Sequence, residues 1–149
     1  GAYVANISVK DLMDVLEIRA SLEGLGASLA AERRNDEDIK NLEELEVEFE
    51  EAVRTQNIDM LLKKDIEFHE CIFKAANNKK LEKMINTLWE QVQRFRITYV
   101  SDSNASLSLI DEHQSILNAI KEGNIADSKK FAIKHIEKAE QFMLEHCTK

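Results

Sequence analysis

The stretch LLKKDIEFHECIFKAA, Leu61–Ala76, decides the predicted fold. Residues four apart in an α-helix lie on one face, and this spacing puts Asp65 and His69 on the face that also carries the large apolar side chains. That stripe comprises Leu61, Leu62, Asp65, Ile66, His69, Ile72, Phe73 and Ala76. An unpaired buried carboxylate is too costly to keep, so Asp65 must be paired, protonated or bound to a metal. The stretch therefore predicts an amphipathic helix with a polar centre inside its buried face.

The composition predicts an all-α fold. The chain has 149 residues, a suitable length for one domain with a sizeable core. It contains no proline and four glycines, and few stretches alternate between apolar and polar residues as half-buried strands do. No apolar run reaches the length of a membrane span and no signal peptide opens the sequence, so we expect no membrane partner.

The charge and the cysteines restrict function and location. The formal net charge is −8 at pH 7, and no basic cluster offsets it. The chain is therefore a poor candidate to bind nucleic acid by itself. The two cysteines, Cys71 and Cys147, form no CxxC pair and indicate no disulfide framework. We expect a protein of the reducing cytoplasm.

Capping residues divide the chain into about six helices. Asn35 followed by Asp38 resembles an N-cap with an acidic residue in the first turn. The expected helices run from Ser8 to about Arg34, Asn35 to about Thr55, Asn57 to Ala76, Asn78 to about Tyr99, Leu109 to about Ile120 and from Asn124 towards the C-terminus, with Ser101–Ser108 as the longest loop. Short connections of this kind predict a compact antiparallel bundle that forms a single domain over residues 1–149.

Each predicted helix has an apolar stripe that faces the core. The stripes include Leu12, Val15, Leu16, Leu22, Leu25, Leu29 and Ala30 in the first helix, Leu42, Leu45 and Phe49 in the second, Met84 in the fourth and Ile125 in the last. Arg19 falls on the stripe of the first helix. Gly24 and Gly26 each cost about 1 kcal/mol relative to alanine, which predicts close helix packing there. The many glutamates of the second helix are interpreted as a solvated outer face.

Three of the four histidines, His69, His113 and His135, fall on the apolar stripes of three different helices. Any one of them alone is explained as a hydrogen-bonded core residue. Together with Asp65 they form a set of three nitrogen ligands and one oxygen ligand, which suits a single divalent transition metal. Three positions before these histidines stand Ile66, Ile110 and Ala132, not the glutamates of a di-iron bundle. From the residues alone, a metal centre and three separate core histidines both remain open.

The order and spacing of several motifs resemble the C-terminal effector-binding domain, called FCD, of FadR-type regulators in the GntR family. LEIRASLEGLGASLAAERRNDEDIKNLEEL, at residues 16–45, is similar to the family's first-helix signature. Asp65–His69 with Phe68 is similar to its Asp-x-x-Phe-His element, and AANNKKL follows at residues 75–81. Glu112-His113 and His135 match the later elements in order. The resemblance extends over residues 11–146 and implies a helical bundle.

The resemblance implies a metal centre and partners. In metal-binding members of the family, one aspartate and three histidines hold a divalent cation in the bundle core, and here Asp65, His69, His113 and His135 fill those positions. Zinc is the expected cofactor, with nickel or manganese as alternatives. The resemblance also implies a homodimer and a small organic acid as effector. It implies DNA binding through an N-terminal winged-helix domain, which is absent from these residues and expected in the full-length protein.

Two arginines are candidate contacts for that acid. Arg19, on the buried stripe of the first helix, can hold a carboxylate as a bidentate fork. A metal held by four protein groups can keep one coordination position for a carboxylate oxygen. Arg96, which borders the stripe of the fourth helix, is a second candidate. The alternative for Arg19 is a structural ion pair with Glu23 or another core acid. We therefore expect a central pocket for both metal and ligand.

Two other functions compete with a sensor domain. A metal-dependent hydrolase would need an activated water and a general base, for which only Glu23 and Glu112 are evident on or beside the stripes. A structural bundle would use the metal only to hold its helices together. No nucleophile motif or glycine-rich phosphate loop is present, so we expect no enzymatic activity. The predicted function is effector sensing and dimerisation in a bacterial transcriptional regulator.

Overall fold

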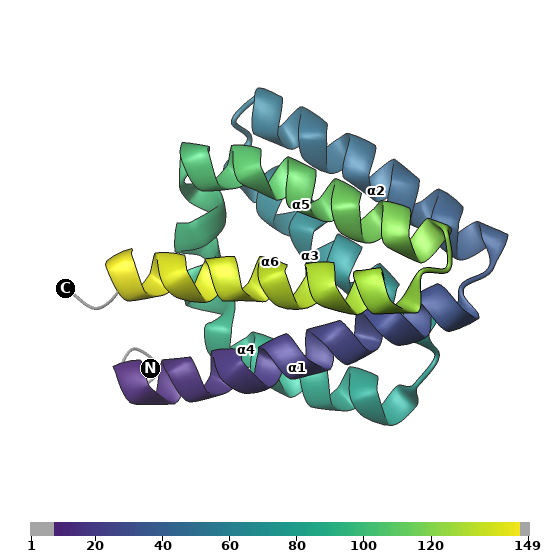
Figure 1. Cartoon of the computed structure of the whole chain (residues 1–149). Coiled ribbons are helices and arrows are strands. Elements are labelled where there is room, and N and C mark those ends of the chain that lie inside the picture. The colour runs from purple at the N-terminus through teal and green to yellow at the C-terminus, as the bar shows by residue number, and fades with distance from the viewer. Residues whose placement is uncertain (1–7, 147–149) are drawn as a thin grey trace.

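The computed structural model describes residues 8–146, and these residues form six α-helices and no strand. The helices are α1 (Val9–Arg33), α2 (Asp36–Arg54), α3 (Ile58–Ala76), α4 (Lys79–Ser101), α5 (Ser103–Lys121) and α6 (Ile125–His146). Figure 1 shows them as one bundle, in which the start of α1 and the end of α6 lie on the same side. The predicted all-α bundle is confirmed, whereas Cys147 lies outside the described residues.

Capping side chains set the helix starts. Asn35 and Asp38 form a reciprocal capping box at the start of α2, with N···O distances of 2.8 and 3.0 Å. The Asp102 carboxylate accepts from the backbone N–H groups two and three residues further on. This single cap is enough to separate α4 from α5, and α5 begins at Ser103. The predicted loop Ser101–Ser108 is therefore wrong, because small polar residues that follow a cap can form the first turns of a helix.

Close packing around α1 holds the bundle together. α1 contacts α3, α4, α5 and α6, and its contact with α6 is the most extensive. A Cβ atom at Gly24 would lie 2.7 Å from Cγ1 of Ile133 in α6, and one at Gly26 would lie 2.6 Å from Cε1 of Phe73 in α3. Neither position has room for a side chain, so the predicted close packing at these glycines is confirmed.

The buried faces carry polar residues beside the apolar ones. The largest fully buried side chains include Leu16, Phe49, Phe68, Phe73, Ile85 and Met143. Glu46 is buried as well, with an exposed fraction of 3%. It lies four residues after Leu42 and three before Phe49, both of which are fully buried, and so it shares their helix face. The interpretation of the α2 glutamates as a solvated face is wrong at this position.

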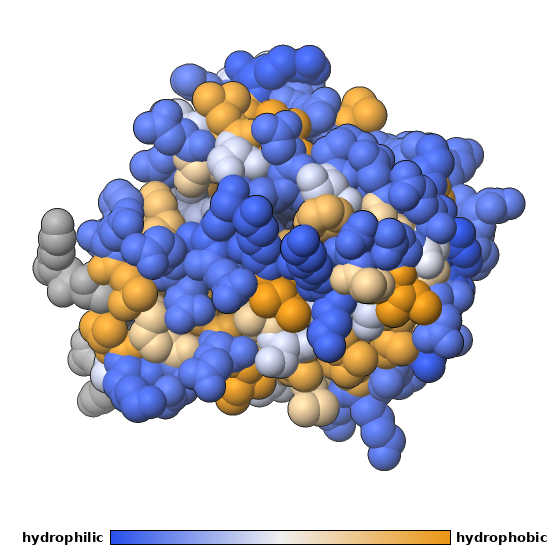
Figure 2. Space-filling view, viewed as in Figure 1, coloured by the Kyte–Doolittle hydropathy of each residue, from blue (hydrophilic) through white to orange (hydrophobic). Residues whose placement is uncertain are grey.

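Some apolar residues lie outside the core. Leu25, Met84 and Ile125, which the stripes place inside, are exposed, as is Ile18. α1 has apolar residues on more than one side, and only part of that surface can face the core. Figure 2 shows apolar atoms gathered over the lower part of the visible face, where α1 runs. Among residues 8–146, no helix has both the length and the apolar character needed to cross a membrane.

Candidate metal centre

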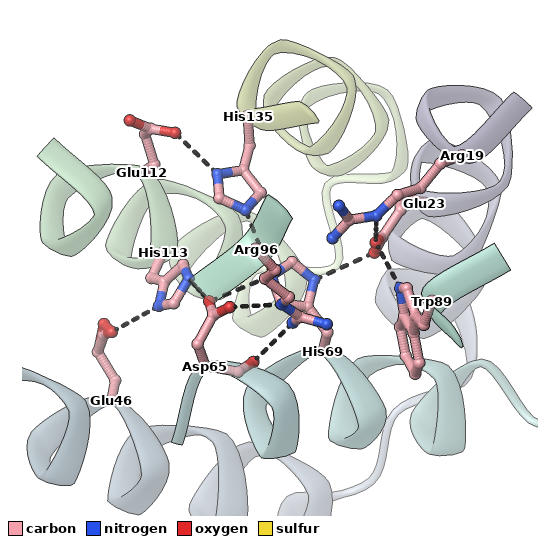
Figure 3. A network of polar contacts seen from close by, with 10 residues as sticks. All are labelled: Arg19, Glu23, Glu46, Asp65, His69, Trp89, Arg96, Glu112, His113 and His135. Carbon is pink, nitrogen blue, oxygen red and sulfur yellow. Dashed lines mark hydrogen bonds and ion pairs between the residues drawn. The ribbon is translucent and has the colours of Figure 1, made fainter. Parts of the chain in front are cut away.

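Three helices bring His69, His113 and His135 together in the middle of the bundle. α3, α5 and α6 each contribute one ring, and all three side chains are buried. One nitrogen of each ring lies within 4.8 Å of the other two. The Nε2 atoms of His69 and His135 are 3.3 Å apart. Figure 3 shows the three rings grouped around the carboxylate of Asp65.

Asp65 completes this group of four side chains. Its Oδ1 lies 3.1 Å from Nε2 of His113 and 3.6 Å from Nε2 of His69. Asp65 Oδ1 and His113 Nε2 are both buried, yet neither has a hydrogen-bond partner of suitable geometry. Buried polar atoms left in this state are costly unless a proton shared between them, an ion or a ligand satisfies them. Ligand atoms of a tetrahedral zinc ion lie roughly 3.4 Å apart. The three histidine nitrogens approach one another as a set, and Asp65 Oδ1 comes within similar distances of His113 and His69, which is compatible with ligands of one divalent ion.

A glutamate holds the other nitrogen of each ring. The Nδ1 atoms are paired with carboxylate oxygens at 3.1 Å (His69 and Glu23), 3.0 Å (His113 and Glu46) and 2.7 Å (His135 and Glu112). An Nδ1–H group that donates to a carboxylate fixes the orientation of the ring and leaves Nε2 as a free lone pair. Metal-binding histidines are commonly held in this way. All three rings can therefore present Nε2 to the centre.

The buried carboxylates of the centre outnumber its guanidiniums. The centre holds four carboxylates and two guanidiniums, those of Glu23, Glu46, Asp65, Glu112, Arg19 and Arg96. Four negative and two positive charges leave a net charge of −2 when the histidines are neutral. An uncompensated charge in the interior is strongly unfavourable. Lys138 beside Glu112 and a proton on His113 reduce this excess in the metal-free protein, and a bound cation would also reduce it.

The histidines differ in protonation. Burial alone would lower the pKa of His113, but the carboxylates of Asp65 and Glu46 beside its two nitrogens raise it to about 9. Burial lowers the pKa of His135 to about 4, although its hydrogen bond to Glu112 acts to raise that pKa. In the absence of a metal, His113 carries a proton at neutral pH and His135 does not. That proton on His113 must leave before the ring can bind a metal.

The two candidate arginines have different partners. Arg96 Nε donates to Asp65 Oδ2 at 2.8 Å, and its Nη2 donates to the Asp65 backbone oxygen at 3.4 Å. Burial opposes ionisation of Asp65, but the Arg96 guanidinium beside it holds the pKa of this carboxyl well below its usual range. Arg96 Nη1 is buried without a partner. Arg19 Nε donates to Glu23 Oε2 at 2.9 Å, which is the structural ion pair considered as the alternative role for Arg19.

Both arginines also line a small internal cavity next to Asp65 and His69. The cavity has a volume of ≈ 20 Å³, enough for about one water molecule. Tyr99 contributes to the same wall, and burial raises the pKa of its hydroxyl, which therefore stays neutral. The cavity thus brings two cationic side chains and a tyrosine next to the group of four.

Aromatic rings enclose two of the three histidines. His113 stacks on Phe68, with ring centres 4.3 Å apart, and its ring centre lies 4.5 Å from that of Phe49. Trp89 lies at the edge of His69, and its Nε1 donates to Glu23 at 3.1 Å. This is the single tryptophan of the chain. Its fluorescence is therefore a direct probe of the centre.

The sequence does not reveal which glutamate partners which histidine. The paired residues stand 46, 67 and 23 positions apart, so only the packing of the helices brings them together. Glu46 is the clearest omission, since its place on the stripe of α2 is readable from the 3.6-residue period. The sequence does single out Glu23 and Glu112, but for other roles. Glu23 is a possible ion-pair partner of Arg19, and both are possible general bases of a hydrolase.

The fold and the site together define an all-α domain that encloses a polar centre of histidines, carboxylates and arginines, an internal site suited to an ion or a small ligand. Residues 14–138 match the model of the FCD domain family, and the chain belongs to this family. The resemblance recognised from the motifs is confirmed.

Two relatives from Bacillus subtilis (strain 168) are similar over most of the chain. The HTH-type transcriptional regulator LutR is 27% identical over 139 residues, covering 90% of this chain and 63% of its own length. The uncharacterized HTH-type transcriptional regulator YdhC is 22% identical over 136 residues, covering 91% and 61%. The chain therefore spans less than two thirds of either relative.

A solved structure shares the fold. E. coli McbR/YncC matches with a TM-score of 0.86 at 17% sequence identity, covering 95% of this chain and 68% of the other. At this level of identity the match supports the helical architecture alone. It agrees with the bundle described above.

Proposed function

We propose that this chain is the effector-sensing domain of a bacterial GntR-family transcriptional regulator and that Asp65, His69, His113 and His135 hold one divalent metal ion. The observation that carries the proposal is the convergence of three Nε2 atoms, each ring held by a glutamate, beside a carboxylate oxygen without a hydrogen-bond partner. Membership of the FCD family and the regulator names of the relatives support the regulatory role.

Zinc suits this ligand set best. Three imidazoles and one carboxylate are ordinary zinc ligands, and nickel or manganese accepts the same groups. A bound ion would supply two positive charges, and a fifth coordination position beside its four protein ligands would take a carboxylate oxygen. The protein's own contribution is to keep the rings oriented and the carboxylate of Asp65 ionised.

A small carboxylic acid is the proposed effector. Arg96 Nη1 has no partner, and Arg96 lines the cavity, so it offers a donor for a carboxylate oxygen. Figure 3 shows the terminal nitrogens of Arg19 directed towards the centre of the network and not towards Glu23. Arg19 can therefore keep its ion pair through Nε and still contact a ligand. The volume of ≈ 20 Å³ holds about one water molecule, so the cavity would have to widen to admit even a small acid.

The proposal also includes a homodimer of this domain. Ile18 and Leu25 are exposed two turns apart on α1, and Met84 is exposed on α4, which packs beside α1. Exposed apolar patches of this kind mark contact surfaces, and we assign this one to a homodimer. DNA would be bound by a separate N-terminal winged-helix domain in the cytoplasm, because a net charge of −8 disfavours contact with phosphates.

A metal-dependent hydrolase is not supported. Its general base would have to be free, and the two acids available for that role are occupied. Glu23 accepts hydrogen bonds from an arginine and a tryptophan and pairs with a histidine. Glu112 is paired with His135 and accepts from Ser108. Both relatives are regulators by name, which agrees with a domain that does not catalyse a reaction.

Metal binding by matched histidine variants tests the proposal. His113→Ala and His135→Ala should weaken Zn²⁺ binding by more than about 100-fold, a larger effect than the loss of a group that only orients a ligand. His146→Ala should leave it unchanged, because His146 is exposed near the end of α6 and, within residues 8–146, its ring contacts the backbone oxygen and the ring of Phe142. Metal analysis measures the metal content of each variant, and calorimetric titration measures its affinity for Zn²⁺. Equal metal content in all three variants would refute the assignment.

A further inference from the structure

A groove between α5 and α6 approaches the centre from the surface. Its volume is ≈ 210 Å³, and its walls include Ser108, Glu112, Ser115, His135 and Lys138. His135 also lines the internal cavity of ≈ 20 Å³. One imidazole ring therefore forms part of the wall of both spaces. The groove and the cavity therefore meet at one of the proposed ligands.

The glutamates that hold the three rings are not equally enclosed. The Glu112 side chain is 10% exposed, whereas those of Glu23 and Glu46 are 4% and 3% exposed. Glu112 Oε2 accepts from Ser108 Oγ at 2.6 Å and lies 3.7 Å from Nζ of Lys138, a side chain that is 49% exposed. Solvent and a flexible lysine thus reach the partner of His135, while the partners of the other two rings are covered.

The rings themselves differ in the same way. His113 packs against two phenylalanine rings, and His69 has the indole of Trp89 at its edge. His135 has aromatic contacts with the other two histidines alone among the described residues. Rotation of His135 therefore disturbs no contact with a phenylalanine or tryptophan ring among the described residues, unlike rotation of either of the other rings.

From this arrangement we propose that the groove between α5 and α6 is the entrance through which a divalent cation reaches the centre, with the Glu112 and His135 side chains as the movable part of its wall. The inference rests on the metal centre proposed above. Outward rotation of the His135 ring would join the groove to the cavity. Glu112 carries the negative charge that attracts a cation there, and Lys138 can move away from it into solvent. His135 is then the last ligand to join the ion and the first to leave it.

Exchange kinetics of Zn²⁺ test the entrance. Uptake is followed by stopped-flow fluorescence of Trp89, and release by transfer of Zn²⁺ to an excess of a fluorogenic chelator. Ser115→Phe fills the groove with a ring, and its hydroxyl is lost at little cost because it bonds only to the Asp111 backbone oxygen. We expect both rate constants to fall at least about tenfold, a rise of about 1.4 kcal/mol in both barriers, with the dissociation constant nearly unchanged. Lys138→Ala should act in the opposite direction and accelerate both.

A matched control uses a groove on another part of the surface. Asn41→Phe adds the same ring to the groove of ≈ 410 Å³ between α2 and α3, which contacts none of the proposed ligands. Its rates should equal those of the wild type. Equal rates in all variants, or equal slowing by both phenylalanines, would overturn the entrance while leaving the metal centre intact. A wild-type chain that binds no divalent ion would refute both. Should Ser115→Phe fail to fold, unchanged rates in Lys138→Ala overturn the entrance.

Discussion

Raising the pH of the metal-free protein from 6.5 to 9 should destabilise it through a single buried group, His113. The pKa of His113 is about 9 in the folded chain and 6.5 in its ordinary, unfolded state. Below pH 6.5 both states bind the proton and the stabilisation is complete. Between pH 6.5 and 9 only the folded state keeps it, so stability falls as the pH rises. Each pH unit in this window contributes about 1.4 kcal/mol, which gives about 3 kcal/mol in total.

The assay is urea denaturation in the presence of a chelator at pH 6.5, 7.5 and 9. His135 does not confuse the result, because its pKa of about 4 lies below 6.5. Its contribution is present above pH 6.5 and is lost as the pH falls towards 4, so it acts on the acid side. Saturating Zn²⁺ should remove the loss at high pH, since a coordinated His113 is neutral at every pH in the window. A metal-free stability that is constant or rises from pH 6.5 to 9 would show that Asp65 and Glu46 do not hold this proton.

Two further predictions concern single side chains. Glu46→Gln keeps the shape of the partner of His113 but removes its charge. It should weaken Zn²⁺ binding by about 10- to 100-fold in a calorimetric titration. Glu43→Gln, on the exposed face of the same helix, should leave Zn²⁺ binding unchanged. Arg19→Lys should weaken the binding of a small carboxylic acid to the Zn²⁺-loaded protein without changing its metal content, because lysine lacks the planar fork; an unchanged affinity in a folded variant would assign Arg19 to the ion pair with Glu23 alone.

The helices and most of the proposed ligand set follow from local patterns in the sequence. Helix starts depend on caps within four residues, and the stripes that carry Asp65 and His69 follow from one helical period. The exposure of Leu25 could not be read in this way, because the period shows which residues share a face and not how wide the buried face is. The burial of Glu46 could not be predicted for a different reason. A glutamate on a stripe is expected outside unless its partner is known, and its partner His113 is 67 residues away.

The centre connects every helix of residues 8–146. A glutamate reaches it from α1 and from α2, Asp65 and His69 from α3, Arg96 from α4, His113 from α5 and His135 from α6. A purely structural core gains nothing from such an arrangement, since well-packed apolar residues are often as stable as buried charges. A sensor does gain from it, because one change of charge at the centre acts on the contacts of all six helices at once. Under the proposed sensor function, the polar centre would couple a bound ion or acid to the packing of the bundle, a role that explains its buried charges better than stability does.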